Sequence, residues 1–331
     1  MTKVYVTQRL LPGALDALLA DGVDVDARDA DTPAETGELT RAVADADAVV
    51  CLLTDRIDEE VLTANPDLKV VANVAAGYDN IDVDAATRAG VAVTNTPGVL
   101  TETTADLALA LILATARRVP EGDAFLRSGR FTHWKLVQEQ LGTDVFGRTL
   151  GVFGMGGIGR AVARRARFGF SMQVQYHSRT RLDPDTEVAL GVRWVAFDEL
   201  LATSDVLSLH APLTAETRHV IGADQLRAMP ASAILINTAR GALVDEAALA
   251  AALRDGEIAG AGLDVYEHEP QVHPDLVELR ERVVLLPHVG SATTGTRQRM
   301  TDLAVGSVRD VLAGRRPANL LNPQVLRART R

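Results

Sequence analysis

Three side chains in the second half of the sequence have the types and positions needed to act together on a carbonyl group. Arg240 lies in LINTARGALVD, Glu269 in AGLDVYEHEP and His288 in VVLLPHVGSAT, and a strand-like apolar run precedes each of them. Residues that follow parallel strands converge at one edge of a sheet. We therefore expect the three side chains to meet in one crevice.

The three groups suit the reduction of a 2-oxo acid. That reaction needs a cation for the carboxylate and carbonyl oxygen, an acid that protonates the developing alkoxide, and a carboxylate that orients and charges the acid. Arg240, His288 and Glu269 supply one of each. A positioned proton donor contributes about 10²- to 10⁴-fold to a rate. Each residue alone is more often structural, so the prediction depends on the set of three.

A glycine-rich turn predicts a dinucleotide site. FGMGGIG follows the apolar run LGVF and precedes the helical stretch IGRAVARRARF. In such a turn Gly154 allows the tight bend, Gly156 admits the pyrophosphate, and Gly159 lets the helix pack on the strand. Amide groups at the helix start then receive the anion. The expected loop contacts are Gly154, Gly156, Gly157, Ile158 and Gly159.

The acidic residue expected after the next strand is missing. An NAD site presents Asp or Glu there to hold the ribose hydroxyls, but this chain has Ser178, Arg179, Thr180 and Arg181. Hydroxyl and guanidinium groups attract a 2′-phosphate that a carboxylate would repel. We therefore predict NADP(H) in preference to NAD(H); the alternative is that the arginines simply face solvent.

The elements that position these residues follow a strand–helix rhythm in two series. Strand-like runs alternate with amphipathic stretches from KVYVT to VAVTN, and again from TLGVFG to RVVLLPH. This rhythm predicts α/β architecture with two doubly wound parallel sheets. Between the series, an apolar helix over 105–116 is expected to cross between domains, with Thr103 and Asp106 as its capping box.

The position of the glycine loop near the middle of the chain indicates an insertion. A late helix, SATTGTRQRMTDLAVGSVRDVLAG, is expected to return to the first domain. The predicted fold is a Rossmann dinucleotide-binding domain, residues 101–289, inserted into a flavodoxin-like substrate-binding domain formed by residues 1–100 and 290–331.

Composition narrows the function classes. The chain has 331 residues and a formal net charge of −10, which argues against a nucleic-acid surface because phosphate binding needs a clustered basic face. No apolar run is long enough for a membrane span or a signal peptide. Cys51 has no partner for a disulfide, which fits a reducing compartment. We expect a cytoplasmic protein without membrane or nucleic-acid partners, and no metal, since no histidine set has metal-ligand spacing.

The sequence resembles the D-isomer-specific 2-hydroxyacid dehydrogenases over essentially its full length. FGMGGIGR, LINTARGALVD, GLDVYEHEP and LLPHVGSAT look like the family's signature segments in order and spacing. The resemblance implies that Arg240 binds substrate, His288 is the general acid/base and Glu269 is its partner. It also implies that Asp264 lies near the nicotinamide carboxamide. The further cofactor contacts are expected at Ser178, Arg179, Thr180, Ala239, Asp264 and Gly290.

The resemblance also gives the first domain a role. The backbone of NVAAGYDNID, around Ala75, Ala76 and Gly77, is implied to grip the substrate carboxylate, and closure of a cleft to assemble the site. The finer similarity is to the glyoxylate/hydroxypyruvate reductase branch, which overlaps with 2-ketogluconate reductases. In that branch a tryptophan, here Trp134, lines the pocket of the neighbouring subunit of a homodimer; plain packing is the alternative. THWKLVQEQLG lacks a proline-containing segment that many relatives have there.

Other activities remain as alternatives. Phosphite dehydrogenases are associated with a lysine where this chain has Ala75 and Ala76, and a formate dehydrogenase would carry glutamine in place of Glu269. A dinucleotide-sensing protein similar to transcriptional corepressors could retain the same residues. Turnover of glyoxylate or hydroxypyruvate, against cofactor binding without turnover, separates the enzyme from the sensor.

Overall fold

The computed structural model describes residues 1–325, and the chain divides into two compact units. The first unit comprises Met1–Leu100 and the chain from Ala292 onward, and the second comprises Thr101–Ser291. The second unit therefore ends two residues beyond the boundary expected at 289. Backbone hydrogen bonds from Val289 and Gly290 to Asp264 hold this stretch to the second unit.

The first unit is built on a five-stranded parallel sheet. Its strands are β1 (Lys3–Val6), β2 (Asp24–Ala27), β3 (Ala48–Cys51), β4 (Val70–Asn73) and β5 (Ala92–Thr94). They lie in the order β2-β1-β3-β4-β5, with Val4 paired to Ala48 and Val49 to Val71. This is the flavodoxin-like order.

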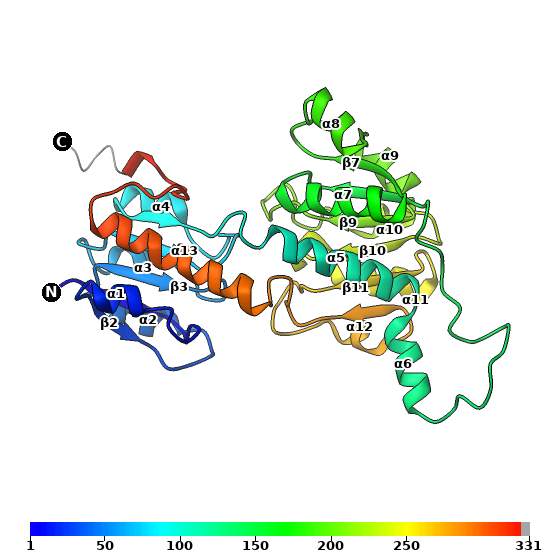
Figure 1. Ribbon diagram of the computed structural model, residues 1–331, viewed down its shortest axis with the longest axis horizontal. Coiled ribbons are helices and arrows are strands. Elements are labelled where there is room, and N and C mark those ends of the chain that lie inside the picture. Colours follow the sequence, from blue (N-terminus) through cyan, green and yellow to red (C-terminus); the bar gives the residue numbers. More distant parts are fainter. Residues whose placement is uncertain (326–331) are drawn as a thin grey trace. The chain divides into compact units, whose positions relative to one another are not determined.

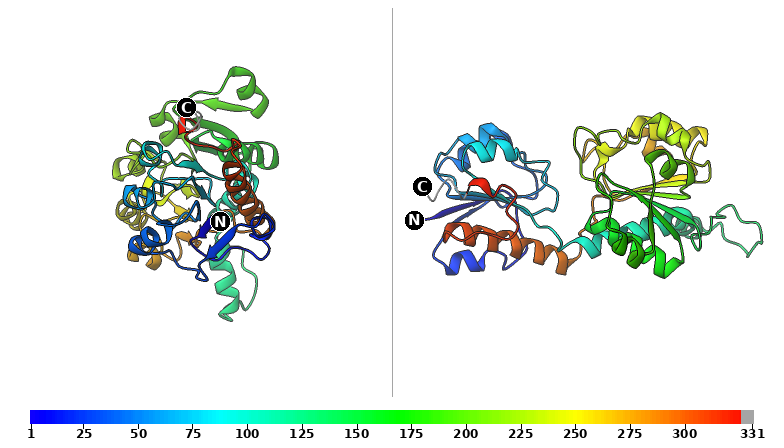
Figure 2. Two further views of the ribbon diagram at one scale, coloured as in Figure 1. Left: turned by 90° about the vertical axis from the view of Figure 1, so that its left-hand side faces the viewer. Right: turned by 90° about the horizontal axis from the view of Figure 1, so that it is seen from above.

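Helices cover both faces of this sheet (Figure 2). They are α1 (Asp16–Ala20), α2 (Thr36–Val43), α3 (Glu59–Thr63), α4 (Val83–Arg88) and α13 (Thr294–Leu312). The helices α2, α3 and α4 pack beside one another, whereas α13 packs on β3, β4 and α1. The late helix therefore belongs to the first unit, and Arg309 of α13 forms an ion pair with Asp21 at 2.6 Å.

The second unit contains a seven-stranded parallel sheet. Its strands are β6 (Thr149–Phe153), β7 (Gln173–His177), β8 (Val192–Trp194), β9 (Val206–Leu209), β10 (Ile234–Asn237), β11 (Gly260–Leu263) and β12 (Val283–Leu285). The order β12-β11-β10-β9-β6-β7-β8 is the Rossmann order with one added edge strand. The strand order reverses between β6 and β9, where dinucleotides bind in such sheets. The predicted fold class is confirmed.

Two apolar layers enclose the second sheet. Its helices are α5 (Thr101–Ala116), α6 (Val119–Arg127), α7 (Gly157–Phe170), α8 (Pro184–Leu190), α9 (Phe197–Thr203), α10 (Ala223–Ala228), α11 (Glu246–Asp255) and α12 (Pro274–Glu278), with a short 3₁₀ turn at Gly241–Leu243. One buried cluster joins α5 and α7 to the sheet, and another joins α9, α10 and α11 to its other face. The β-branched and leucine-rich strands are buried on both sides, as parallel sheets require.

The start of α5 differs from the expectation, and one segment of the second unit projects from it. The helix expected from 105 begins at Thr101, so the predicted capping box of Thr103 and Asp106 is wrong. Asp106 instead accepts a hydrogen bond from Arg165 of α7 at 2.7 Å. Residues 119–148, which we call the arm, comprise α6 and a segment without regular structure. Helix α6 and the loop after it project from the second unit (Figure 1), and the arm returns to this unit at Val145, which belongs to a buried cluster. No helix within residues 1–325 is both long enough and apolar enough to cross a membrane.

Candidate active site

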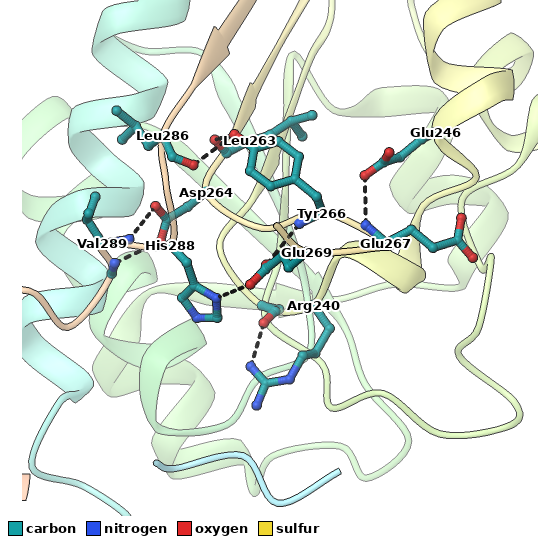
Figure 3. Close-up of polar contacts among 12 residues, drawn as sticks. Arg240, Glu246, Leu263, Asp264, Tyr266, Glu267, Glu269, Leu286, His288 and Val289 are labelled. Atoms are coloured by element: carbon teal, nitrogen blue, oxygen red, sulfur yellow. Dashed lines mark hydrogen bonds and ion pairs between the residues drawn. The ribbon is translucent and has the colours of Figure 1, made fainter. Parts of the chain in front are cut away.

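Glu269 and His288 form a hydrogen-bonded pair at the carboxyl edge of the second sheet. Glu269 lies in the segment after β11, and His288 follows β12. His288 Nδ1 lies 2.8 Å from Glu269 Oε2, and the Tyr266 N–H donates to Glu269 Oε1 at 3.0 Å (Figure 3). A carboxylate can only accept, so Nδ1 carries the proton in this bond. The other ring nitrogen, Nε2, is then the atom that can exchange a proton with a ligand.

The charge of Glu269 suits this role. Burial disfavours the carboxylate, but the His288 hydrogen bond and charge, the Tyr266 N–H and the Arg240 charge outweigh it, so the pKa of Glu269 lies below its ordinary value. Glu269 is therefore ionised at neutral pH. A fixed negative charge beside the ring stabilises the imidazolium that forms when His288 holds a second proton.

Arg240 stands beside this pair at the end of β10 (Figure 3). Its Nη1 donates to the Ala239 carbonyl at 2.8 Å, and its own carbonyl accepts from Asn237 Nδ2 at 2.8 Å. Asn237 Oδ1 accepts in turn from the Ala239 N–H at 3.0 Å. The buried amide of Asn237 thus closes the turn that aims Arg240. The structure brings Arg240, Glu269 and His288 to one edge of one unit.

A close approach at Gly241 sets the spacing of two site segments. A Cβ atom at Gly241 would lie 1.8 Å from the Tyr266 carbonyl carbon. The backbone after Arg240 therefore contacts the backbone of the Tyr266–Glu269 segment directly, which no residue other than glycine allows. Sequence reasoning missed this contact, because it joins two segments more than twenty residues apart.

Asp264 has a structural task that the sequence did not reveal. It is 1% exposed, and its carboxylate accepts the Val289 N–H at 2.7 Å and the Gly290 N–H at 2.8 Å. Burial raises its pKa despite these two bonds and the charge of His288. His288 itself has a φ of 53°, a left-handed conformation that is uncommon without glycine. Asp264 therefore holds the turn that fixes the backbone of His288.

The glycine loop fits a dinucleotide. Gly154 has a φ of 96°, and a Cβ there would lie 2.6 Å from the Ala211 nitrogen. A Cβ at Gly159 would lie 2.2 Å from the Gly154 carbonyl oxygen, so helix and strand are in close contact. Gly156 caps α7, and no atom lies within 4 Å of where its Cβ would be. Gly157 and Ile158 open α7, so the first N–H groups of a 14-residue helix border this open side.

The segment after β7 carries the residues predicted to select NADP(H). Ser178 Oγ donates to the Thr180 carbonyl at 2.6 Å, which compacts the turn. Arg179 is exposed, and it makes no hydrogen bond or ion pair within residues 1–325. Arg181 differs, because Glu187 accepts from its Nε at 2.9 Å and from its Nη2 at 2.8 Å.

The remaining predicted site residues lie in the first unit or the arm. Ala75, Ala76 and Gly77 follow β4 at the carboxyl edge of the first sheet. Their carbonyls accept from the Thr96 N–H, from Asn95 Nδ2 and from Asn73 Nδ2 at 2.8, 2.6 and 3.0 Å respectively. Their N–H groups donate to no acceptor within the described residues. Trp134 lies in the arm with 69% of its surface exposed.

Comparison with known proteins decides the family. The model of the D-isomer specific 2-hydroxyacid dehydrogenase NAD-binding domain matches residues 109–290. The chain belongs to this family. The predicted family and the broad enzyme class of D-2-hydroxyacid dehydrogenase are thereby confirmed.

Individual relatives place the 2-hydroxyacid dehydrogenase within its family. The glyoxylate reductase of Korarchaeum cryptofilum is 48% identical over 330 residues, covering 99% of this chain and 98% of the relative. The structure of the TT0316 protein of Thermus thermophilus superposes with a TM-score of 0.90 at 45% identity, covering 97% and 100% of the two chains. An NADPH-dependent glyoxylate/hydroxypyruvate reductase of Sinorhizobium meliloti, in complex with NADP and malonate, has a TM-score of 0.84 at 34% identity, covering 97% and 98%. The similarity to the glyoxylate reductase branch is confirmed.

Proposed function

We propose that this dehydrogenase reduces a small 2-oxo acid, glyoxylate or hydroxypyruvate, to the D-2-hydroxy acid with NADPH. The observation that carries the proposal is the His288–Glu269 pair at 2.8 Å beside Arg240. The full-length similarity to glyoxylate reductases supports the substrate class. Bound at the glycine loop, the nicotinamide cofactor supplies the hydride.

The protein residues bind and protonate the substrate. The Arg240 guanidinium binds the substrate carboxylate and carbonyl oxygen, and bidentate geometry orients the carbonyl carbon. His288 Nε2 gives its proton to the carbonyl oxygen, and Glu269 stabilises the ring while it is charged. In the reverse direction His288 accepts the hydroxyl proton. The unpaired N–H groups of Ala75, Ala76 and Gly77 suit the substrate carboxylate, which the sequence resemblance also implies.

The cofactor proposal rests on the segment after β7. Arg179 offers an exposed guanidinium beside the hydroxyls of Ser178 and Thr180, and no carboxylate stands at the position where NAD enzymes present one. The predicted contacts at Ala239, Asp264 and Gly290 also remain proposals. Asp264 would act by shaping the turn after His288 as well as by facing the cofactor.

Arg179→Ala tests the cofactor proposal. Because a hydrogen bond to a charged group contributes about 1.5–3 kcal/mol, we expect the NADPH Kd to rise about 10- to 100-fold. The NADH Kd should stay within about twofold of wild type, since NADH lacks the phosphate. Arg148→Ala is the matched control, because it removes the same charge from the residue before β6, at the opposite edge of the sheet. An equal rise in the Kd for NADPH and in the Kd for NADH would contradict the assignment of Arg179 to the 2′-phosphate.

A panel of 2-oxo acids tests the activity. Glyoxylate, hydroxypyruvate, pyruvate, 2-ketogluconate and phenylpyruvate are assayed with NADPH and NADH, and loss of the reduced cofactor is followed. We expect the highest kcat/KM for glyoxylate or hydroxypyruvate with NADPH. A higher kcat/KM for 2-ketogluconate supports the 2-ketogluconate reductase alternative. Phosphite is assayed separately with NADP⁺ or NAD⁺ as the oxidant, and its oxidation supports the phosphite dehydrogenase alternative. Tight cofactor binding without turnover of any substrate supports the corepressor-like sensor and contradicts the enzyme.

We also propose a homodimer formed through the arm. Several large apolar side chains of α6 and the following segment are exposed: Leu126, Phe131, Trp134, Leu136, Val137, Leu141 and Phe146. Large apolar side chains exposed along one segment are characteristic of an interaction surface. Light scattering should give a dimer mass, and Trp134→Ala should weaken the dimer, whereas Phe168→Ala, which removes an exposed aromatic from α7, should not. A monomer at assay concentration would contradict this proposal. The cytoplasmic location stays a prediction.

A further inference from the structure

We propose that Tyr176, Glu187 and Arg181 form a clamp that positions residues 178–180 for recognition of the cofactor 2′-phosphate. The inference deepens the NADPH proposal and rests on it. It assigns different tasks to the two arginines of SRTR: Arg179 meets the phosphate, whereas Arg181 holds the segment in place.

Tyr176 ties the end of the segment to the strand before it. Its side chain is fully buried, with 0% exposure of the residue, at the next-to-last position of β7. The hydroxyl donates to Glu187 Oε1 at 2.7 Å and accepts from the Leu182 N–H at 2.9 Å. One buried hydroxyl therefore joins β7, the end of the segment and α8. The phenol hydroxyl thus acts both as a donor and as an acceptor in holding these elements together.

Glu187 ties the same segment to α8. Its carboxylate accepts two parallel bonds from the Arg181 guanidinium, at 2.9 and 2.8 Å, in addition to the Tyr176 bond. The guanidinium also lies 5.8 Å from the ring centroid of Trp194 in β8. The start of α8 is fixed independently, because Asp183 caps it by accepting the Thr186 N–H at 2.9 Å. Residues 178–182 are thus held at both ends, by β7 on one side and by α8 on the other.

The charges of the clamp persist at physiological pH. The Arg181 hydrogen bonds, followed by the Tyr176 hydroxyl, lower the pKa of Glu187 to about 2. Burial and the Glu187 bond raise the pKa of Tyr176 to about 12, so the phenol keeps the proton that it donates. Bidentate pairing with Glu187 neutralises Arg181. Glu187 already engages the Nε and Nη2 atoms of Arg181, whereas exposed Arg179 makes no hydrogen bond within the described residues, so its whole guanidinium can face a phosphate.

Glu187→Gln separates the clamp from simple electrostatics. Removing a carboxylate near a phosphate site weakens repulsion and releases Arg181, so Coulomb attraction alone predicts tighter NADPH binding. The clamp predicts weaker binding, with an NADPH Kd raised about 3- to 10-fold, since each lost hydrogen bond contributes about 0.5–1.5 kcal/mol. The NADH Kd and kcat at saturating NADPH should stay within about twofold of wild type. NADPH binding that is unchanged or tighter overturns the clamp.

Tyr176→Phe provides a second variant that leaves both charges in place. In the cofactor-free protein, hydrogen–deuterium exchange of a peptide covering 178–182 should become faster, because the Leu182 N–H loses its buried acceptor. Tyr5→Phe is the matched control, since it deletes another buried tyrosine hydroxyl in the first unit. Exchange over α11 should stay unchanged in both variants, which excludes general unfolding.

The two measurements separate the clamp from the NADPH proposal. A wild-type preference for NADH contradicts the NADPH proposal, and the exchange experiment still decides the clamp because it uses protein without cofactor. If Tyr176→Phe leaves the exchange of residues 178–182 unchanged, the clamp is wrong, whichever cofactor the wild type prefers.

Discussion

His288 and Glu269 share one hydrogen bond, 2.8 Å long, between Nδ1 and Oε2. Glu269 has its other oxygen fixed by the Tyr266 N–H at 3.0 Å, so the carboxylate is held at both atoms. The backbone of His288 is also held, because Asp264 accepts the two N–H groups that follow it. The imidazole therefore has little freedom to turn Nε2 away from a bound substrate.

His288→Ala removes the proposed proton donor. We expect kcat for 2-oxo acid reduction to fall about 10²- to 10⁴-fold, with a much smaller effect on the cofactor Kd, because the proposed pyrophosphate and ribose contacts lie at the glycine loop and after β7. Steady-state assays and fluorescence titration of the cofactor measure the two effects. His273→Ala is the control, since the Nδ1 of that histidine has no hydrogen-bond partner within the described residues. Full kcat in His288→Ala would show that another group protonates the substrate.

Glu269→Gln keeps the shape of the pair but removes its charge. We expect kcat for reduction at neutral pH to fall about 10- to 100-fold, because a charged hydrogen-bond partner contributes about 1.5–3 kcal/mol to the imidazolium. The pKa of Glu269 is depressed from 4.5, so the wild type keeps this carboxylate charged above about pH 4.5 and loses the charge as the pH falls through the lower folded-state value. The deficit of the variant should therefore narrow only at acid pH. A pH-independent deficit would contradict a role for this charge.

Asp264→Asn tests whether the Asp264 carboxylate fixes the turn that follows His288. An asparagine can accept only one of the two N–H groups, and its own NH₂ then faces the other donor. One buried unsatisfied donor costs about 1–3 kcal/mol of unfolding free energy, and kcat should fall because the turn is no longer fixed. Urea denaturation and steady-state kinetics measure both effects. Asp245→Asn, at a helix cap in the same unit, is a useful comparison, because it alters an aspartate that accepts the Ala248 N–H away from His288. Wild-type stability and turnover in Asp264→Asn would contradict the role of this carboxylate.

Gly241→Ala tests the close contact between the two site segments. The added Cβ would collide with the Tyr266 carbonyl, so we expect a loss of about 1–3 kcal/mol of unfolding free energy, typical of overpacking, together with reduced turnover. Gly169→Ala in α7 is the control, since no atom lies within 4 Å of its Cβ position. Alanine is favoured over glycine in a helix by about 0.5–1 kcal/mol, so this control should be neutral or stabilising. A neutral Gly241→Ala would show that the segments can separate without loss.

The sequence predicts the architecture well because the signals for it are local. Strand-like runs such as ILIN and VVLL, each followed by a helical stretch, specify parallel sheets, and the position of FGMGGIG specifies the insertion. The rule that strand ends converge then places Arg240, Glu269 and His288 together. The start of α5 was less predictable, because Thr101 and Thr103 are both acceptable beginnings of the same apolar helix.

The supporting contacts could not be read from the sequence. The bonds of Asp264 to Val289 and Gly290 join residues about 25 positions apart, and their existence depends on how tightly the chain turns after β12. The pairing of Arg181 with Glu187 was likewise not readable from the sequence, because it depends on where α8 begins. A buried Asp at a strand end and a Glu on a short helix are weak signals until neighbouring backbone atoms are known.

Arg240, Glu269 and His288 occupy fewer than fifty consecutive positions and are supported by residues of the same unit. The residues proposed to transfer the proton thus all lie in the second unit, whereas the loop after β4, proposed to recognise the substrate, lies in the first. Chimeras that exchange the first unit between homologues should therefore change which 2-oxo acid is reduced and keep the type of reaction. This makes the fold a suitable starting point for reductases with other substrates.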